Sequence, residues 1–183
     1  MALTEDEKRA ALSIARGAIT RALDGSKDKA AETSEEHKGL KAPLGLFVTL
    51  HKAGSLRGCI GNFTSDTPLY ENIKDMACAA AFNDPRFTPV SLEELPSIHI
   101  EISVLSPLRE IKDINEIEVG RHGIFIQRGY SRGVLLPQVA VENGFDRETF
   151  LEHTCMKAGL SPGCWKEDVK ISIFEADIFS ETP

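Results

Sequence analysis

The segment SIHIEISVLS, residues 97–106, constrains the fold more than any other part of the chain, because apolar and polar residues alternate along it. Side chains of a β-strand point alternately to its two faces, so this pattern predicts a strand with one covered and one open face. The covered positions are Ile98, Ile100, Ile102 and Val104, and the open positions are His99, Glu101 and Ser103. Such a strand requires a sheet with elements packed on one side.

Helical and extended patterns are interspersed along the rest of the chain, and several strands follow one another through short turns. A first helix is expected at residues 5–23, with Thr4 and Glu7 as its capping box. A second is expected up to residue 82, with Thr67 as its N-cap and Pro68 at the first helical position. Pro137 and Gln138 start a short helix or turn, and a last helix is expected at 147–158 after Asp146. Strands are expected at residues 44–52, 56–63 and 98–104, in a hairpin over 123–136, and at 168–179 with a bulge near Phe174. We therefore predict an α+β fold, a mainly antiparallel sheet flanked by helices.

The 183 residues suffice for one sizeable core and are few for two full domains, so we expect a single domain over residues 1–183. The polar stretch 24–43 reads as a surface connection. No run approaches 18 consecutive apolar residues, and the start MALTEDEKRA lacks the basic and apolar parts of a signal peptide. The expected location is the cytoplasm.

The four cysteines, at positions 59, 78, 155 and 164, form no CxxC pair and are read as free thiols. His153, Cys155 and Cys164 lack the paired spacing of a structural zinc site, so no metal is expected. Neither GxGxxG nor a phosphate-binding P-loop pattern occurs, and no cofactor is expected.

The net charge of −7 argues against bulk binding to nucleic acid or anionic membranes. Residues 37–65 and 119–141 nevertheless contain no Asp or Glu. We call them the acid-free windows; their basic residues are Lys38, Lys41, Lys52 and Arg57, and Arg121, Arg128 and Arg132. Buried strands that exclude carboxylates would explain the pattern, and so would two segments that face one another across a cationic cleft.

The segment Leu56–Gly61, LRGCIG, places Cys59 between two glycines and close to an arginine. Accessible backbone amides and a guanidinium stabilise a thiolate or a bound anion, so Cys59 is a candidate nucleophile, redox group or ligand contact, with Gly58, Gly61 and Arg57 around it. The alternative is a small buried residue in a tight turn.

Three further side chains are candidates for the same site. Arg86, on the turn that follows a helix, suits either a carboxylate or phosphate ligand or a structural ion pair. His122 lies in an acid-free window and is the best-placed imidazole for proton exchange. Gln138, beside Pro137, could orient a ligand or cap a backbone group. Glu101 and His99 share a strand face, which reads either as a catalytic pair or as a solvated surface.

The ordered series LRGCIG, NDPRFTPVSLEEL, EISVLSP, GRHGI, LLPQVA and FLEHTCMKAGL…CW resembles the AMMECR domain family over residues 44–179. The resemblance implies two unequal lobes, with the LRGCIG segment near a cleft between them. It also implies the A component of AmmeMemoRadiSam gene sets, with a Memo-like protein and a radical SAM protein as partners and an anionic, nucleotide-containing substrate.

Two functions remain open at this stage. In the first, the protein is an enzyme or enzyme subunit in which Cys59 and His122 are catalytic, and Arg57, Gly58, Gly61, Arg86 and Gln138 bind substrate. In the second, it is a non-catalytic module that docks on the Memo-like or radical SAM component, and the glycines and the cysteine are structural.

Overall fold

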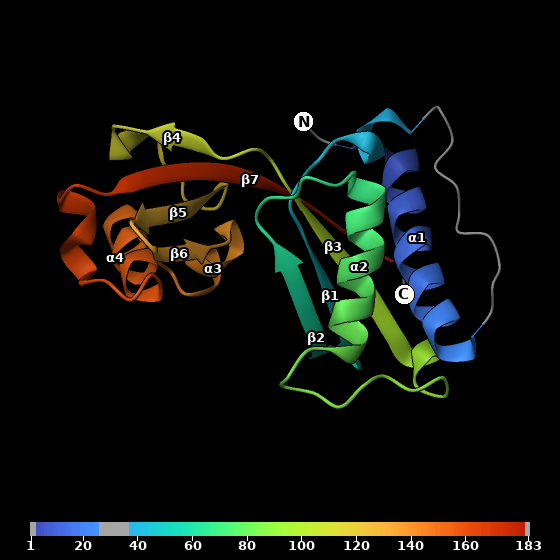
Figure 1. The fold of residues 1–183 in the computed structure, drawn as a ribbon. Helices are drawn as coiled ribbons and strands as arrows, with labels where there is room; N and C mark the ends of the chain where they lie inside the picture. Colours follow the sequence, from blue (N-terminus) through green and yellow to red (C-terminus); the bar gives the residue numbers. More distant parts are fainter. Residues whose placement is uncertain (1–2, 26–36, 182–183) are drawn as a thin grey trace. The chain divides into compact units, whose positions relative to one another are not determined.

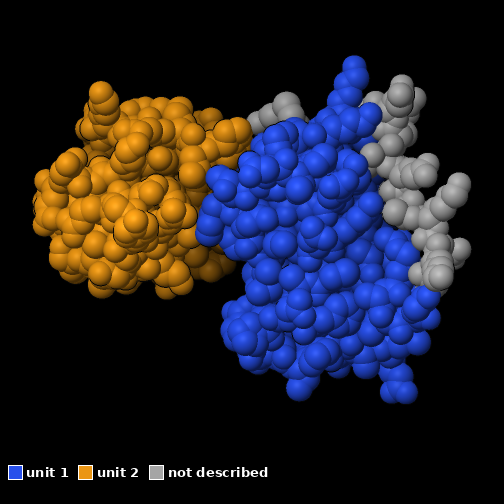
Figure 2. Space-filling view, in the orientation of Figure 1, with its two compact units in different colours: residues 1–105, 177–183 blue, residues 106–176 orange. Residues whose placement is uncertain are grey.

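The computed structural model describes residues 3–25 and 37–181 and divides into two compact units of unequal size (Figure 2). Unit 1 contains residues 1–105 and 177–183, and unit 2 contains residues 106–176. Each unit has its own hydrophobic core. The α+β class with a mainly antiparallel sheet is confirmed.

Unit 1 is a sheet with two helices on one face (Figure 1). Its strands follow the order β2 (Ser55–Asn62), β1 (Leu46–Lys52), β3 (Ile98–Leu105), with the end of β7 (Lys170–Ser180) beside β3. The β1–β2 and β1–β3 pairs are antiparallel. Helices α1 (Glu5–Asp24) and α2 (Leu69–Phe82) supply the apolar side chains that cover the sheet.

The predicted alternation of β3 is confirmed by its burial. Ile98, Ile100, Ile102 and Val104 are all buried in the core of unit 1. On the other face, His99 and Glu101 are half-buried, whereas Ser103 is buried. The strand therefore has the covered face and the polar face that its sequence predicts.

Helix ends in unit 1 follow local chemistry, with one correction. The capping box of Thr4 and Glu7 is present, and Gly25 ends α1 in the left-handed conformation. Helix α2 begins one residue later than expected, because Pro68 is extended and serves as the N-cap itself. The Thr67 hydroxyl lies 2.9 Å from that of Ser65 and caps no amide of the helix.

Unit 2 is a second antiparallel arrangement with its own helices. Strand β7 pairs with β4 (Arg109–Ile111) and with β5 (His122–Arg128), and β5 forms the expected hairpin with β6 (Ser131–Leu135). Helices α3 (Pro137–Glu142) and α4 (Arg147–Lys157) follow, and Asp146 caps α4 as predicted.

The bulge expected near Phe174 is wrong. The register of β7 against β5 runs without a shift from Lys170 to Glu175. Residues 171–174 are all buried, so both faces of the strand are covered there. Phe174 packs over Gly123, where an added Cβ would lie 2.3 Å from the ring. Burial on two faces, and not a register slip, therefore interrupts the alternation.

The expectation of four free thiols is wrong for two of them. Cys155 and Cys164 form a disulfide, with Cα atoms 5.9 Å apart. Gly159, at a φ of 72°, turns the chain after α4, and the 3-10 helix η4 (Pro162–Lys166) carries Cys164 back to it. Cys59 and Cys78 are free thiols.

Of the polar stretch 24–43, residues 26–36 lie outside the described residues. The 3-10 helix η1 (Lys38–Lys41) follows and buries Leu40 completely. The amide of Gly39 donates to Glu7 at 2.7 Å, which attaches η1 to α1. None of the helices within residues 3–25 and 37–181 combines the length and the hydropathy of a membrane-spanning segment.

Candidate functional site

Cys59 lies on β2 with its side chain on the face of the sheet opposite α2. An added Cβ on Gly58 would lie 2.3 Å from the carbonyl oxygen of Ala80 in α2, so Gly58 faces that helix. Successive residues of a strand point to opposite faces, and Cys59 therefore points away from it. The Cys59 side chain is half-buried, and its Sγ accepts a hydrogen bond from the Thr49 hydroxyl at 3.3 Å.

The amide and the carbonyl of Cys59 are both held by one ion pair, in which Asp84 is buried and Arg86 is exposed. Its amide donates to Asp84 Oδ2 at 2.9 Å, and its carbonyl accepts from Arg86 Nη2 at 3.2 Å. Asp84 is almost fully buried and pairs with Arg86 at 2.7 Å. The Arg86 guanidinium holds the pKa of the Asp84 carboxyl well below its usual range. Arg86 thus positions Cys59 by contacts within the chain.

Arg57 is the extra residue of a β-bulge, because Leu50 pairs with Gly58 and His51 with Leu56. Its guanidinium donates to both Glu94 oxygens, at 2.9 and 3.0 Å. The Arg57 and Lys52 cations lower the pKa of Glu94 to about 2.

One nitrogen of the Arg57 guanidinium has no hydrogen-bond partner among the described residues. Arg57 Nη2 also donates to the carbonyl of Thr88 at 2.9 Å, whereas Nη1 is buried and has no hydrogen-bond partner among the described residues. A buried donor without an acceptor is costly, so this nitrogen is the one place on Arg57 where an acceptor atom of a ligand would be favourable.

The two glycines of the motif allow close packing on opposite faces of β2. Gly58 approaches the α2 backbone, and an added Cβ on Gly61 would lie 2.3 Å from the Leu46 carbonyl oxygen and 2.5 Å from the Phe47 ring. Both lie within β2, in the strand expected over residues 56–63, and not in the tight turn that was the alternative for Cys59. Their part in substrate binding stays a prediction.

His122 and Gln138 belong to unit 2. His122 is buried, its Nδ1 accepts from the Glu118 amide at 3.1 Å, and its Nε2 lies 3.8 Å from Glu175 Oε1. Gln138 lies in the first turn of α3, and its buried Oε1 has no partner within residues 3–25 and 37–181. The structure thus brings Arg57, Cys59 and Arg86 together within unit 1.

The cations of the acid-free windows are largely paired with acids from elsewhere in their own units. Lys52 joins Arg57 on Glu94. In unit 2, Arg121 pairs with Glu118 and Glu175, and Arg128 pairs with Glu167. That the two windows face one another across a cationic cleft stays a prediction. The described residues hold no group of three or more His, Cys, Asp or Glu side chains that could bind a metal ion.

Four features of this site were not expected from the sequence: Thr49, Asp84, Glu94 and the bulge at Arg57. The position of Asp84 two residues before Arg86 is the sequence signal that could have paired them. Glu94 lies 37 residues from Arg57, and no local pattern joins them.

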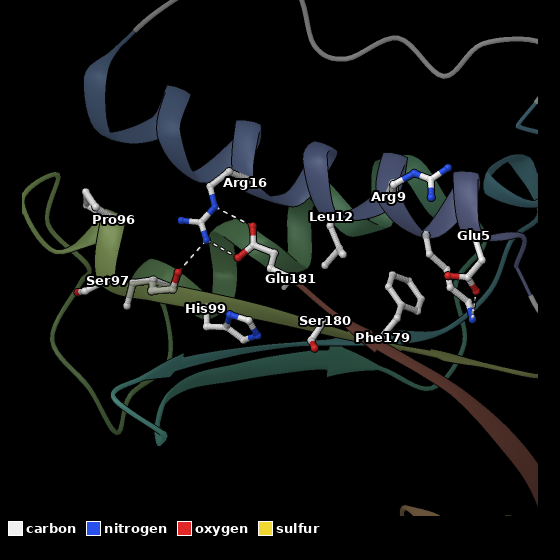
Figure 3. Close-up of a pocket in the computed structure, with 12 residues that line it drawn as sticks. Glu5, Arg9, Leu12, Arg16, Pro96, Ser97, His99, Phe179, Ser180 and Glu181 are labelled. Atoms are coloured by element: carbon white, nitrogen blue, oxygen red, sulfur yellow. Dashed lines mark hydrogen bonds and ion pairs between the residues drawn. The ribbon is translucent and has the colours of Figure 1, made fainter. Parts of the chain in front are cut away.

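A groove in unit 1 was also not foreseen (Figure 3). Its wall includes α1, the start of β3 and the end of β7. Arg16 crosses it to pair with Glu181 and donates to the carbonyl of Ile98 at 2.7 Å. The His99 ring, on the side of β3 away from Arg16, also lines the groove.

Comparisons with known proteins agree with this architecture. The chain is 42% identical to a protein of Methanosarcina mazei, over 98% of this chain and 94% of that one. It is 44% identical to protein MJ0810 of Methanocaldococcus jannaschii, over 98% and 92%. The crystal structure of the uncharacterized protein PH0010 from Pyrococcus horikoshii matches with a TM-score of 0.84 and 39% identity, over 98% of this chain and 93% of that one. The family model AMMECR1 matches residues 12–179, across both units, and the chain therefore belongs to the AMMECR1 family.

Proposed function

We propose that the protein is an enzyme or enzyme subunit whose reactive group is the Cys59 thiol. One observation carries the proposal: the buried Asp84 and its exposed partner Arg86 hold both backbone polar groups of Cys59, while the half-buried sulfur accepts one hydrogen bond within the described residues, from the Thr49 hydroxyl. A residue with a fixed backbone and a sulfur open to reagents suits a nucleophile or redox group.

The substrate we propose carries an anionic or strongly accepting group, such as a phosphate or carboxylate. Arg57 supports this, because its Nη1 is a buried donor that lacks an acceptor within the described part of the chain. Guanidinium groups bind carboxylate and phosphate oxygens through such donors. A nucleotide-containing substrate, His122 as a proton carrier and Gln138 as a ligand contact belong to the same proposal.

The setting we propose is the cytoplasm, with a Memo-like protein and a radical SAM protein as partners. These assignments rest on the likeness of the motif series to the A component of AmmeMemoRadiSam systems. They make the thiol part of a multi-protein pathway.

A partner-binding module without catalysis is the second candidate, and one specific observation favours it. The motif glycines pack against backbone and ring atoms, and Arg86 is bound to Asp84, so much of LRGCIG has a structural use. Under this function Cys59 would be replaceable.

Alkylation and complementation on the same variants decide between the two. Under limiting iodoacetamide near neutral pH, Cys59 should be alkylated at least about tenfold faster than Cys78. Cys78 is the internal control, because burial raises the pKa of its thiol. Mass spectrometry of the digested protein measures both rates.

In a strain that lacks the gene, Cys59→Ala should fail to complement while its melting temperature stays within a few degrees of the unmodified protein. Cys78→Ala is the matched control and should complement. If Cys59 resists alkylation in the native protein, and Cys59→Ala complements, the enzyme proposal is wrong and the partner module stands.

A further inference from the structure

We propose that His51 accepts the thiol proton of Cys59 and that Glu101 orients the His51 ring, on the face of the unit 1 sheet opposite α2. The inference rests on the proposed function and deepens it: it assigns the thiol the chemistry of a nucleophile toward an electrophilic carbon, and not that of a redox group.

The strand register places these residues together. Thr49 of β1 is paired with Cys59 of β2 on one side and with Glu101 of β3 on the other. Paired residues of neighbouring strands share a face, so Cys59, Thr49 and Glu101 form a row across three strands. His51 lies two residues after Thr49 and therefore on the same face.

His51 is diagonal to Glu101 in the unbroken β1–β3 register, and diagonal to Cys59 in the β1–β2 pair, where the bulge at Arg57 separates Cys59 from Leu56, the partner of His51. Diagonal neighbours on one face have Cα atoms about 7–8 Å apart, which long and ring-containing side chains can span. A nucleophile, an imidazole and a carboxylate are thereby grouped around Thr49. The four side chains are all half-buried, so reagents and substrates reach them.

The proton transfer follows from the chemistry of these groups. The Cys59 proton moves from Sγ to a ring nitrogen of His51, which leaves a thiolate and an imidazolium. The Thr49 hydroxyl, which already donates to Sγ, stabilises the thiolate, and the Glu101 carboxylate stabilises the imidazolium. The sulfur electron pair then forms a bond to carbon, and the leaving group departs with the bonding pair and takes the proton from His51.

No hydrogen bond joins His51 to Cys59 or Glu101 within the described residues, so Thr49 is the contact the sulfur has at rest. Catalytic hydrogen bonds are often long in unliganded enzymes and tighten when substrate binds. Rotation of the His51 ring toward Cys59 is the movement that the proposal requires.

His99 provides the matched control. His99 of β3 is paired directly with His51 of β1, and both side chains are half-buried imidazoles. His99 lies one strand further from Cys59. A histidine that acted only through general charge or packing on this face would behave as His99 does.

The test is the rate of Cys59 alkylation by iodoacetamide as a function of pH. We expect His51→Gln to lower the rate at neutral pH by about tenfold or more and to move the rise of the rate toward alkaline pH. Glu101→Gln should lower the rate less, and His99→Gln should leave both rate and profile unchanged. The melting temperature of each variant shows whether it has folded.

A second measurement uses the unaltered chain, so the test does not depend on the variants folding. Alkylation of Cys59 removes the thiolate, and the pH-dependent NMR signal of the His51 ring should change while that of His99 does not. If both ring signals and the His51→Gln profile stay as in the unmodified protein, while Cys59 still reacts faster than Cys78, His51 is not the proton acceptor and the thiol proposal survives. A Cys59 that does not react overturns both.

Discussion

At the scale of single residues, Asp84 and Arg86 cover backbone groups on the exposed edge of β2. In the unit 1 order β2–β1–β3, β2 has a free edge, and unpaired amides and carbonyls on an edge attract other strands. At Cys59 these groups are satisfied by Asp84 and Arg86. The same contacts that block the edge also fix the thiol, so edge protection and site geometry are one feature.

Gly58 is where the packing of the motif can be tested most directly. Gly58→Ala would place Cβ against the Ala80 carbonyl oxygen, and backbone of a helix cannot move as a side chain can. We expect a loss of unfolding free energy on the order of 1–3 kcal/mol, measured by denaturant titration.

Gly163→Ala is the control for that change, because nothing lies within 4 Å of the added Cβ and no positive φ is present there. It should alter stability by less than about 0.5 kcal/mol. Equal losses for both variants would mean that close approach of β2 to α2 is not what Gly58 provides.

At the scale of elements, Glu94 ties the segment before β3 to both strands of the β1–β2 hairpin, through Lys52 and Arg57. Its pKa is lowered to about 2 from an ordinary value of 4.5. A carboxyl group with a lower pKa in the folded state stabilises above its ordinary value, and that stability is lost as the pH falls through the lower value. The relevant window is therefore pH 4.5 down to 2.

We expect the protein to lose up to about 3 kcal/mol of stability across this window through Glu94. Glu94→Gln should be less stable at pH 7 and should show a flatter fall between pH 4.5 and 2, in denaturant titrations at each pH. The exposed neighbour Glu93→Gln should follow the unmodified protein. Parallel curves for Glu94→Gln and the unmodified protein would contradict the assigned role.

Elements whose signals are local were predictable from the sequence. The capping box at Thr4, the alternation of β3 and the cap at Asp146 each depend on residues within one turn or one strand, and all three are confirmed. The bulges were not predictable in this way: β7 has none at Phe174, and β2 has one at Arg57. A strand that is buried on both faces and a strand with a register shift both interrupt the alternation of apolar and polar residues, so the sequence does not tell them apart.

The partners within the site were not predictable, because they are distant in sequence. Thr49 and Cys59 meet through register, and Arg57 and Glu94 meet through the path of the chain after α2. The Cys155–Cys164 bond depends on a turn at Gly159, and its spacing matches no paired-cysteine motif. Tertiary geometry decides such contacts, and no window of a few residues contains it.

At the scale of the whole molecule, residues 3–25 and 37–181 form two hydrophobic cores, and the disulfide belongs to one of them. Cys155 and Cys164 are both buried in the core of unit 2. A short disulfide loop stabilises a fold by about 2–4 kcal/mol. Reduction should therefore weaken unit 2 in preference to unit 1.

Hydrogen exchange before and after reduction measures this. Amides of β5 and α4 should exchange at least about tenfold faster in the reduced protein, while those of β1 keep their rates. The Cys155→Ser, Cys164→Ser double variant should reproduce the reduced pattern without reductant. Uniform acceleration across both units would show that they unfold as one cooperative body.

Strand β7 is shared between the units: residues 170–175 pair within unit 2, and residues 177–180, followed by Glu181, complete unit 1 beside β3. The Glu181 amide donates a hydrogen bond to the Ile100 carbonyl, and the Glu181 carboxylate accepts one from the Ile100 amide. The Asp177 carboxylate accepts a hydrogen bond from the Leu3 amide. During synthesis on the ribosome, β1, β2 and β3 emerge well before these residues, so the edge of β3 waits unpaired while all of unit 2 is made. The first unit therefore closes only after residues 177–181 have been made.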